Sequence, residues 1–423
     1  METERKTGLL AWWHRTPLYL RILGALVLGL VTGLLLGMRA EPLAIPSKLV
    51  LRLLGALAPA LILFAIIQAL IAAKFEKGTA GRLIRLLALN TLVAICVGLL
   101  VANLIKPGHW SKLAPAATAA AENGEGRPDM LQMFLENIPR SLLGPLTDNG
   151  KVIGVIFLAL AFGIALRSRA HRPIHTVSEF IDLSLQTLVT ILHWIIDLVP
   201  LAVFGLVASI VGTQGFGPFH ALGAFIVSVL VALLVQTAYY LARIHFGSWV
   251  NPIALLSGTR DALVMAFSTS SSTVTMPVTF ECLWKRVGLR EKSASLGALV
   301  GSNFNNDGTA LYEAMSALFI SQMLAAQGLG VELTLAQQFL VVVTSVIASV
   351  GAAGIPEAGL VTMTLVFHAV GLPTEYIALL LPVDWFLDRC RTVINVLGDM
   401  NVSCLLDGQT REIRPDDAAS AAP

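Results

Sequence analysis

One stripe of polar side chains inside a hydrophobic segment constrains the fold of this chain. Its members, Asp384, Asp388, Arg391, Asn395 and Asp399, follow one another at spacings of four, three, four and four residues. Those spacings place all five on one face of an α-helix. Facing lipid, its four ionisable side chains would cost on the order of 10 kcal/mol, at roughly 2.5 to 3.5 kcal/mol each. The stripe must therefore line an enclosed site, and its mixed signs suit a ligand with an amine and carboxylates, with cations nearby.

The remaining sequence supports a membrane setting. Hydrophobic residues make up 56% of the chain, charged residues make up 13%, and apolar runs of membrane length recur throughout. We therefore predict an all-α membrane protein with several spans, in contact with the lipid bilayer. The net charge of +2 gives no reason to expect nucleic-acid binding, and the four cysteines, which lack metal-ligand spacing, are predicted to be free thiols.

Apolar segments predict six conventional helices in the first part of the chain. They lie at residues 17–37, 44–73, 83–104, 130–166, 176–211 and 221–244. Basic clusters occur at the amino terminus, between the second and third segments, and after the fourth. Alternate loops are therefore positive, which predicts that both termini are cytoplasmic. The acidic connection 106–129 is expected outside, and the tail after Asp407 is expected to be disordered.

Two later segments, 253–284 and 335–370, are apolar but interrupted. The first is broken by the serine- and threonine-rich run 268–273, and the second by GAAGIPEAGL at 351–360. Non-helical backbone at membrane depth is tolerated only where it lines a cavity. Interrupted segments in corresponding halves indicate a transporter site built on inverted repeats, so we predict two re-entrant hairpins. The amino ends of their half-helices attract anions.

Between these segments, the sequence NNDGT at 305–309 interrupts an apolar helix. Carboxylate, amide and carbonyl oxygens in an unwound stretch suit a hard monovalent cation such as sodium. Glu313 lies four residues beyond Thr309 and shares its helical face. A carboxyl group in that position predicts a proton carrier, whereas a place at a helix end facing water is the alternative.

The serine-rich run, NNDGT, GAAGIPEAGL and DWFLDRCRTVINVLGD follow one another in the order and spacing found in the glutamate transporter family. The chain therefore resembles the dicarboxylate/amino acid:cation symporters. This resemblance implies the glutamate-transporter fold, with eight transmembrane helices and two re-entrant helical hairpins. It also implies a homotrimer in which a mobile transport domain moves as an elevator against a fixed scaffold, gated mainly by the second hairpin.

The resemblance implies a division of the chain along its length. Scaffold and trimerisation helices 1 and 2 would occupy residues 1–80, and scaffold helices 4 and 5 residues 130–212. The transport domain would comprise helix 3 at 81–106 and the segment 217–407, which holds helix 6, the first hairpin, helix 7, the second hairpin and helix 8. Residues 408–423 would form the disordered tail.

The resemblance also implies a substrate site. Asp388 would hold an amino group, Arg391 a side-chain carboxylate, and Thr392 with Asn395 the region of the α-carboxylate. A bidentate arginine matches a carboxylate, and Asp388 favours an amino acid over a plain dicarboxylate. The remaining members of the implied substrate site are Ser271, Ser272, Thr309, Ile355 and Gly359.

Three sodium sites are implied in the same way. Their members are Gly301, Asn305, Asn395 and Asp399 in the first, Asn303, Ser349, Val350 and Ala352 in the second, and Asn90, Thr91, Asn305 and Asp307 in the third. Glu313 would couple transport to protons, and Tyr312 raises potassium counter-transport as an option. Asn303 and Asn306 depart from the residues usual in the family, so the preference for sodium is open. Glu357 departs at the second hairpin, where a carboxylate is either exposed and harmless or changes gating and the response to pH.

The expected function is secondary active symport of glutamate or aspartate, driven by sodium or proton gradients, in the inner (plasma) membrane of a cell. Two alternatives stay open on the same fold, a C4-dicarboxylate symporter and a substrate-gated anion channel, as does a sensor that binds without transport. An enzyme is not expected. An intramembrane hydrolase could use Ser271, but the polar motifs contain no histidine to act as its base.

Overall fold

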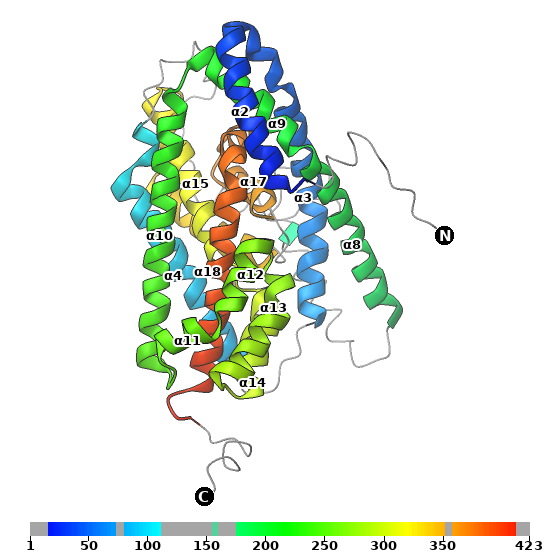
Figure 1. The fold of residues 1–423 in the computed structure, drawn as a ribbon, viewed down its shortest axis with the longest axis vertical. Helices are drawn as coiled ribbons and strands as arrows, with labels where there is room; N and C mark the ends of the chain where they lie inside the picture. Colours follow the sequence, from blue (N-terminus) through cyan, green and yellow to red (C-terminus); the bar gives the residue numbers. More distant parts are fainter. Residues whose placement is uncertain are drawn as a thin grey trace, which may run out of the picture.

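The computed structural model describes residues 16–72, 80–110, 155–156, 159, 175–351 and 358–411. Every element within these ranges is a helix, as the predicted all-α class requires. Long helices such as α10 and α18 run along the long axis of the molecule (Figure 1). The predicted helix 130–166 and the loop 106–129 lie almost entirely outside the described residues, as do the tail from 412 and residues 352–357.

The first part of the chain contains long apolar helices. The elements are α2 (Leu18–Leu36), η1 (Gly37–Ala44), α3 (Ile45–Ala72), α4 (Ala80–Ile105), η2 (Pro107–Trp110), α8 (His175–Asp197), α9 (Val199–Gln214) and α10 (Gly217–Gly247). Helices α2, α3, α4 and α10 match predicted segments closely. Within the described ranges, three helical stretches are long and apolar enough to cross a membrane, Leu18–Leu51, Gly81–Trp110 and Gly217–Gly247.

The single helix predicted at 176–211 was wrong. The chain instead forms α8 and α9, which are bent by 40° at Leu198. Pro200 lies in the first turn of α9. Proline has no backbone N–H to continue the hydrogen-bond ladder, and its ring clashes with the carbonyl four residues earlier, so a helix breaks there. Counted as one bent span, the pair would be a fourth crossing.

The second part of the chain is made of shorter pieces. They are α11 (Pro252–Gly258), α12 (Arg260–Thr269), α13 (Ser272–Glu281), η3 (Cys282–Val287), α14 (Glu291–Ser295), η4 (Leu296–Val300), η5 (Gly301–Asn303), α15 (Asp307–Ala326), α16 (Leu335–Gly351), α17 (Ala358–Ala369), η6 (Thr374–Leu380) and α18 (Leu381–Asp407). Helix α12 packs against α13, and α16 packs against α17. The first break is at Ser270, whose φ is 53°.

Helices α15 and α18 form the centre of the molecule. Every residue of α15 from Asp307 to Leu324 is buried, and α18 packs against α10, α12 and α15. Residues 304–306 before α15 are not helical, so the NNDGT sequence does interrupt a helix. The two most polar motifs of the chain therefore lie side by side in its interior.

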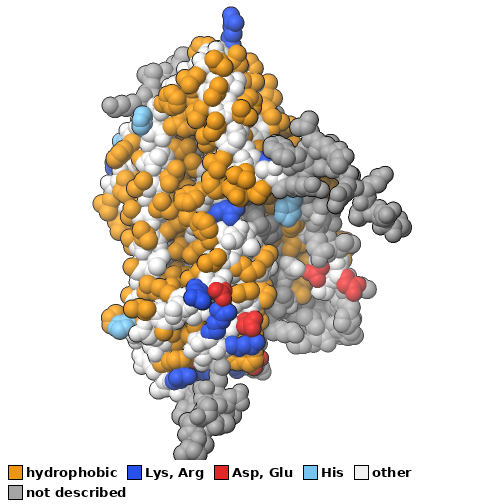
Figure 2. All heavy atoms as spheres, in the orientation of Figure 1, with side chains coloured by type: hydrophobic (Ala, Val, Ile, Leu, Met, Phe, Trp, Pro, Cys, Tyr) orange, Lys and Arg blue, Asp and Glu red, His pale blue; other side chains and the backbone are white. Residues whose placement is uncertain are grey.

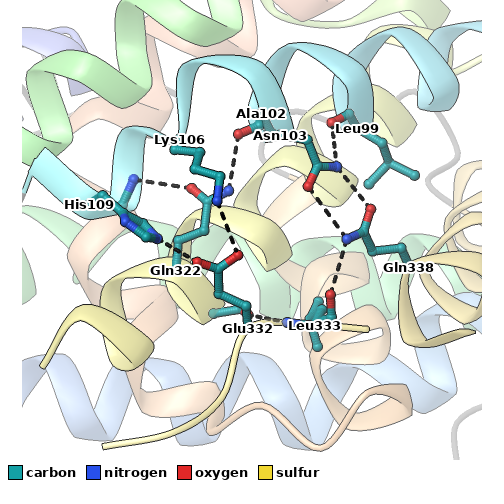
Figure 3. A network of polar contacts seen from close by, with 11 residues as sticks. Leu99, Ala102, Asn103, Lys106, His109, Gln322, Glu332, Leu333 and Gln338 are labelled. Carbon is teal, nitrogen blue, oxygen red and sulfur yellow. Dashed lines mark hydrogen bonds and ion pairs between the residues drawn. The ribbon is translucent and has the colours of Figure 1, made fainter. Parts of the chain in front are cut away.

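A polar network joins the end of α4 to α15 and α16 (Figure 3). The side-chain amide of Asn103 donates to Gln338 Oε1 at 2.9 Å, and Gln322 Nε2 donates to the carbonyl of Ala102 at 3.0 Å. His109 Nε2 lies 2.6 Å from an oxygen of Glu332. These bonds hold the end of α4 beside α15 and α16.

Hydrophobic side chains cover most of the described surface visible in Figure 2, whereas charged side chains gather towards one end. Many large apolar side chains are exposed, among them Leu35 at 80% and Leu104 at 74%. Exposed apolar surface of this extent on long apolar helices indicates contact with lipid. The chain is therefore a membrane protein with several spans.

Glycines allow α2, η1 and α9 to pack closely. A Cβ atom placed on Gly205 of α9 would lie 1.9 Å from the carbonyl oxygen of Leu43, and one on Gly29 of α2 would lie 2.7 Å from that of Phe204. Small residues at such contacts let membrane helices approach through their backbones. These contacts hold α2, η1 and α9 together as one packed unit.

We predict that Gly205→Ala lowers the temperature of thermal unfolding, measured in detergent, because backbone oxygen cannot move away from the new methyl group. Overpacking of this kind costs about 1 to 3 kcal/mol. Gly24→Ala is the matched control, because a Cβ there meets nothing within 4 Å. It should unfold at the wild-type temperature or above it, and equal unfolding temperatures for the two variants would contradict the packing.

Candidate functional site

Arg391 of α18 lies at the centre of the polar interior. Its side chain is fully buried, at 0% exposure, and its Nη1 lies 3.0 Å from an oxygen of Asp384. Its Nη2 donates to Asp388 Oδ1 at 2.7 Å. The guanidinium also lies over the ring of Tyr312, 4.0 Å from the ring centroid. Two carboxylates and one guanidinium are thus enclosed together, as the helical spacing of the stripe predicted.

Part of the Arg391 guanidinium has no partner in the structure. Its Nε has no hydrogen-bond acceptor among the described residues, although it is buried. Gly359, in the first turn of α17, approaches the same group, and a Cβ there would lie 3.2 Å from Nη1. The N–H groups in the first turn of a helix attract anions. A buried N–H donor beside a helix amino end favours a ligand with a carboxylate.

Asn395 joins α18 to the start of α15. Its Oδ1 accepts the backbone N–H of Gly308 at 2.8 Å, and its Nδ2 lies 3.4 Å from Thr309 Oγ1. Gly308 permits this contact, because a Cβ there would lie 2.6 Å from the carbonyl oxygen of Arg391. The hydroxyl of Thr392 donates to the carbonyl of Asp388 in its own helix at 2.8 Å.

The tip between α12 and α13 lies against α18. Ser271 caps α13 and accepts the N–H of Val274 at 3.2 Å, whereas the buried Ser272 hydroxyl has no partner among the described residues. Arg389 donates to the carbonyls of Phe267 and Ser268 at 2.8 and 2.7 Å. It thereby satisfies the carbonyl end of α12, and this contact was not anticipated from the sequence.

The four residues of the first predicted sodium site come together. Asn305 Nδ2 donates to the carbonyl of Asn395 at 3.0 Å and to Asp399 Oδ1 at 3.1 Å. Gly301 is adjacent, because a Cβ there would lie 3.5 Å from the same Asp399 oxygen. The Oδ1 of Asn305 has no partner among the described residues. Carboxylate, amide and carbonyl oxygens gathered in this way suit a hard cation.

In the second predicted site, a neighbouring side chain already binds one of the expected cation ligands. Asn306 Nδ2 donates to the carbonyl of Ser349 at 2.8 Å, so an N–H group already occupies one expected cation ligand. The Asn303 side chain donates to the carbonyl of Leu299 at 3.1 Å. Ala352 lies outside the described residues, as do Ile355 of the substrate site, Glu357 and the side chain of Val350.

The third predicted site contains two residues that sequence reasoning missed. Thr91 donates to Asp307 Oδ1 at 2.6 Å, and the hydroxyl of Tyr240 donates to Asp307 Oδ2. Arg243 donates to Asn90 Oδ1. Tyr240 and Arg243 are three residues apart in the apolar helix α10, and that spacing was the available signal.

Glu313 lies inside α15 and is fully buried, at 0% exposure, so it does not face water at a helix end. The hydroxyl of Thr362 from α17 donates to its Oε1. Its Oε2 has no partner among the described residues. Glu313 therefore connects α15 to α17 at Thr362, three residues beyond Gly359, and a change in the protonation of Glu313 would alter the contact between the two helices.

Comparison with known proteins gives a consistent result. The model of the sodium:dicarboxylate symporter family matches residues 18–409. Excitatory amino acid transporter 4 of Mus musculus is 35% identical over 302 residues, which is 69% of this chain and 51% of that protein. Excitatory amino acid transporter 3 of Homo sapiens is 30% identical over 442 residues, which is 90% of this chain and 83% of that protein. The match thus spans about half the length of the first of these relatives.

We predict that Asn306→Met lowers the sodium concentration needed for half-maximal stabilisation of the purified protein. Removing the amide frees the Ser349 carbonyl to bind a cation, so the unfolding temperature should respond at lower sodium. Asn103→Met, which removes an amide from the network with Gln338, is the control and should leave the half-maximal sodium concentration unchanged. An unaltered sodium response in Asn306→Met would show that this hydrogen bond does not compete with a cation.

Proposed function

The chain belongs to the sodium:dicarboxylate symporter family, and from that membership we propose that it is a secondary active symporter of acidic amino acids. The names of the relatives describe transporters of excitatory amino acids, not enzymes. The observation that carries the proposal for this chain is the buried Arg391, which is paired with Asp388 and keeps an N–H donor without an acceptor among the described residues.

The charges of the site fit a dicarboxylic amino acid. Asp384, Asp388 and Arg391 together carry one excess negative charge when both acids are ionised, and an acidic amino acid adds another, so charge balance in the complex requires the coupled cations. A substrate amino group can pair with Asp388 and draw it from Arg391 Nη2, and that Nη2 together with the unpartnered Nε can then hold the side-chain carboxylate. Thr392 and Asn395 of α18 would hold the α-carboxylate. Thr309 of α15 and Ser271 and Ser272 of the first hairpin would complete the pocket. Aspartate and glutamate differ by one methylene, typically about 1 to 3 kcal/mol of discrimination.

The arrangement of the helices supports an elevator mechanism. Helix α2 packs against α9, and α3 packs against α8 and α9, which together would form the scaffold. Helices α4, α10, α12 and α15 pack around α18 and would form the transport domain, with α16 and α17 as the gating hairpin. We place eight spans and two re-entrant hairpins in each protomer of a homotrimer, in the inner (plasma) membrane with both termini in the cytoplasm.

The proposed driving ions are sodium and protons. The oxygen ligands around Asn305 and Asp399 support a sodium site, and the buried Glu313 beneath α17 supports proton coupling. Potassium counter-transport through Tyr312 stays a prediction. The second candidate function is C4-dicarboxylate symport, favoured by the description of the family, although Asp388 would then lack an amine to pair with.

The test is uptake of radiolabelled aspartate, glutamate and succinate into liposomes under sodium, proton and potassium gradients, each imposed alone. We expect accumulation of aspartate or glutamate against its gradient. In Arg391→Cys, the affinity for both acidic amino acids should fall roughly 10- to 100-fold, because hydrogen bonds to charged groups contribute about 1.5 to 3 kcal/mol. Neutral amino acids should then compete.

Arg389→Cys is the matched control, because its side chain bonds to α12 carbonyls and not to the site. It should keep the preference for acidic over neutral amino acids. Unchanged glutamate affinity in Arg391→Cys would remove Arg391 from the site. Accumulation of succinate alone would favour the dicarboxylate symporter, and passive flux without accumulation would indicate a channel.

We predict that Glu313→Gln abolishes the dependence of net uptake on an imposed proton gradient, because an amide cannot carry a proton across the membrane. Exchange of internal for external substrate should continue, since it requires no net proton movement. Both are measured in the same liposomes, with Gln322→Glu as a control that adds a carboxyl group elsewhere on α15. Uptake in Glu313→Gln that still follows the proton gradient would exclude Glu313 as the proton carrier.

A further inference from the structure

Helix α10 brings two polar side chains to the predicted third cation site, one to Asp307 and one to Asn90. Tyr240 and Arg243 are one turn apart, and both reach the predicted third cation site. Tyr240 donates to Asp307, and Arg243 donates to Asn90, which neighbours the Asp307-bound Thr91. Arg243 is half-buried, whereas Asn90 and Asp307 are fully buried, at 0% exposure. The positive charge of Arg243 is thus held at Asn90, next in sequence to the Thr91 that binds the buried Asp307 carboxylate, and opposite charges attract.

Most of the side-chain oxygen atoms that a cation would need here are already bound to donors. The side-chain oxygen of Asn90 accepts an N–H of Arg243, and the two oxygens of Asp307 accept the hydroxyls of Thr91 and Tyr240. A hard cation requires several oxygen ligands with free lone pairs. Asn305 Oδ1, which this site shares with the first predicted site, is its only side-chain oxygen without a partner among the described residues, and a guanidinium bonds to Asn90. The set therefore fits a sodium ion less well than the first predicted site does.

We propose that the guanidinium of Arg243 takes the place of a third coupled cation and provides the positive charge that balances Asp307. Arginine keeps its charge at all accessible pH values, so this charge is permanent. It also belongs to the protein and is not released on either side of the membrane. Resting on the proposed symport function, the inference means that each transport cycle carries one cation fewer than the three predicted sites would allow.

The alternative role for Arg243 is purely interfacial. It lies four residues before the end of α10 at Gly247, and arginines near helix ends often extend their charge towards the membrane surface. Its guanidinium also lies 5.4 Å from the ring centroid of Tyr239. An interfacial arginine would leave the cation sites unaffected, and this difference can be measured.

The test is the sodium dependence of the unfolding temperature of the purified protein without substrate, with choline replacing sodium at constant ionic strength. Arg243→Met removes the charge and the N–H donors and leaves a shorter, unbranched side chain. Asp307 and Asn90 should then accept a sodium ion, so the slope of stability against the logarithm of sodium concentration should rise by about one ion. Arg243→Lys should keep the wild-type slope because it retains the charge.

Arg85→Met on α4 is the matched control, because Arg85 is exposed and bonds to a backbone carbonyl of its own helix. Its slope should equal that of the wild type. If Arg243→Met, Arg85→Met and the wild type all show one slope, Arg243 does not replace a cation and the proposal is overturned.

A double-mutant cycle gives a second test that needs no sodium. Asp307→Asn alone should leave the Arg243 charge unbalanced and lower the unfolding temperature in choline. Adding Arg243→Met should restore part of that loss, because interacting residues give non-additive effects. Simple addition of the two losses would contradict the pairing. Neither test requires transport. If the protein gives the expected result in both tests but fails the uptake assay, the proposed transport function is refuted and the role of Arg243 is not.

Discussion

The interior of this protein is organised by the need to keep one guanidinium away from lipid. Arg391 is neutralised by Asp384 and Asp388 and covered by the ring of Tyr312. Removing one partner of a buried ion pair costs far more than the pair contributes, because a charge is left without compensation. Helices α15 and α17 must therefore stay close to α18, and the surrounding apolar helices separate this polar centre from the bilayer.

The broken helices follow from the same requirement. Regular helices satisfy their own backbone groups and offer none to a ligand, whereas interruptions at residues 270–271 and 304–306 free amides and carbonyls inside the protein. Side chains satisfy many of these groups, such as Asn395 at Gly308 and Arg389 at the end of α12. Several buried side chains of the described residues still lack partners, and those of Arg391, Ser272 and Asn305, which lie in the candidate sites, mark where ligands would complete the structure.

The sequence predicted those features that depend on local spacing. The stripe on α18, the break at NNDGT and the interruption at Ser270 were all visible, because helical period and membrane burial leave few alternatives. The bend at Leu198 was missed because the apolar pattern continues through Pro200. The roles of Tyr240, Arg243 and the Asn306 amide also lay beyond the sequence, since each depends on contacts between distant segments. The spacing of residues shows which side chains share a helical face, but only the packed structure shows which segment that face contacts.

The close approach of α15 to α18 has a consequence for the history of the sequence. At Gly308 no side chain fits, because the carbonyl oxygen of Arg391 lies where a Cβ would be. The same residue supplies the N–H that Asn395 binds. A change of the ligand bound at Arg391 could therefore arise through exchange of side chains in the site, but hardly through a shift of α15 relative to α18. Substrate preference in this architecture can diverge faster than the backbone that displays it.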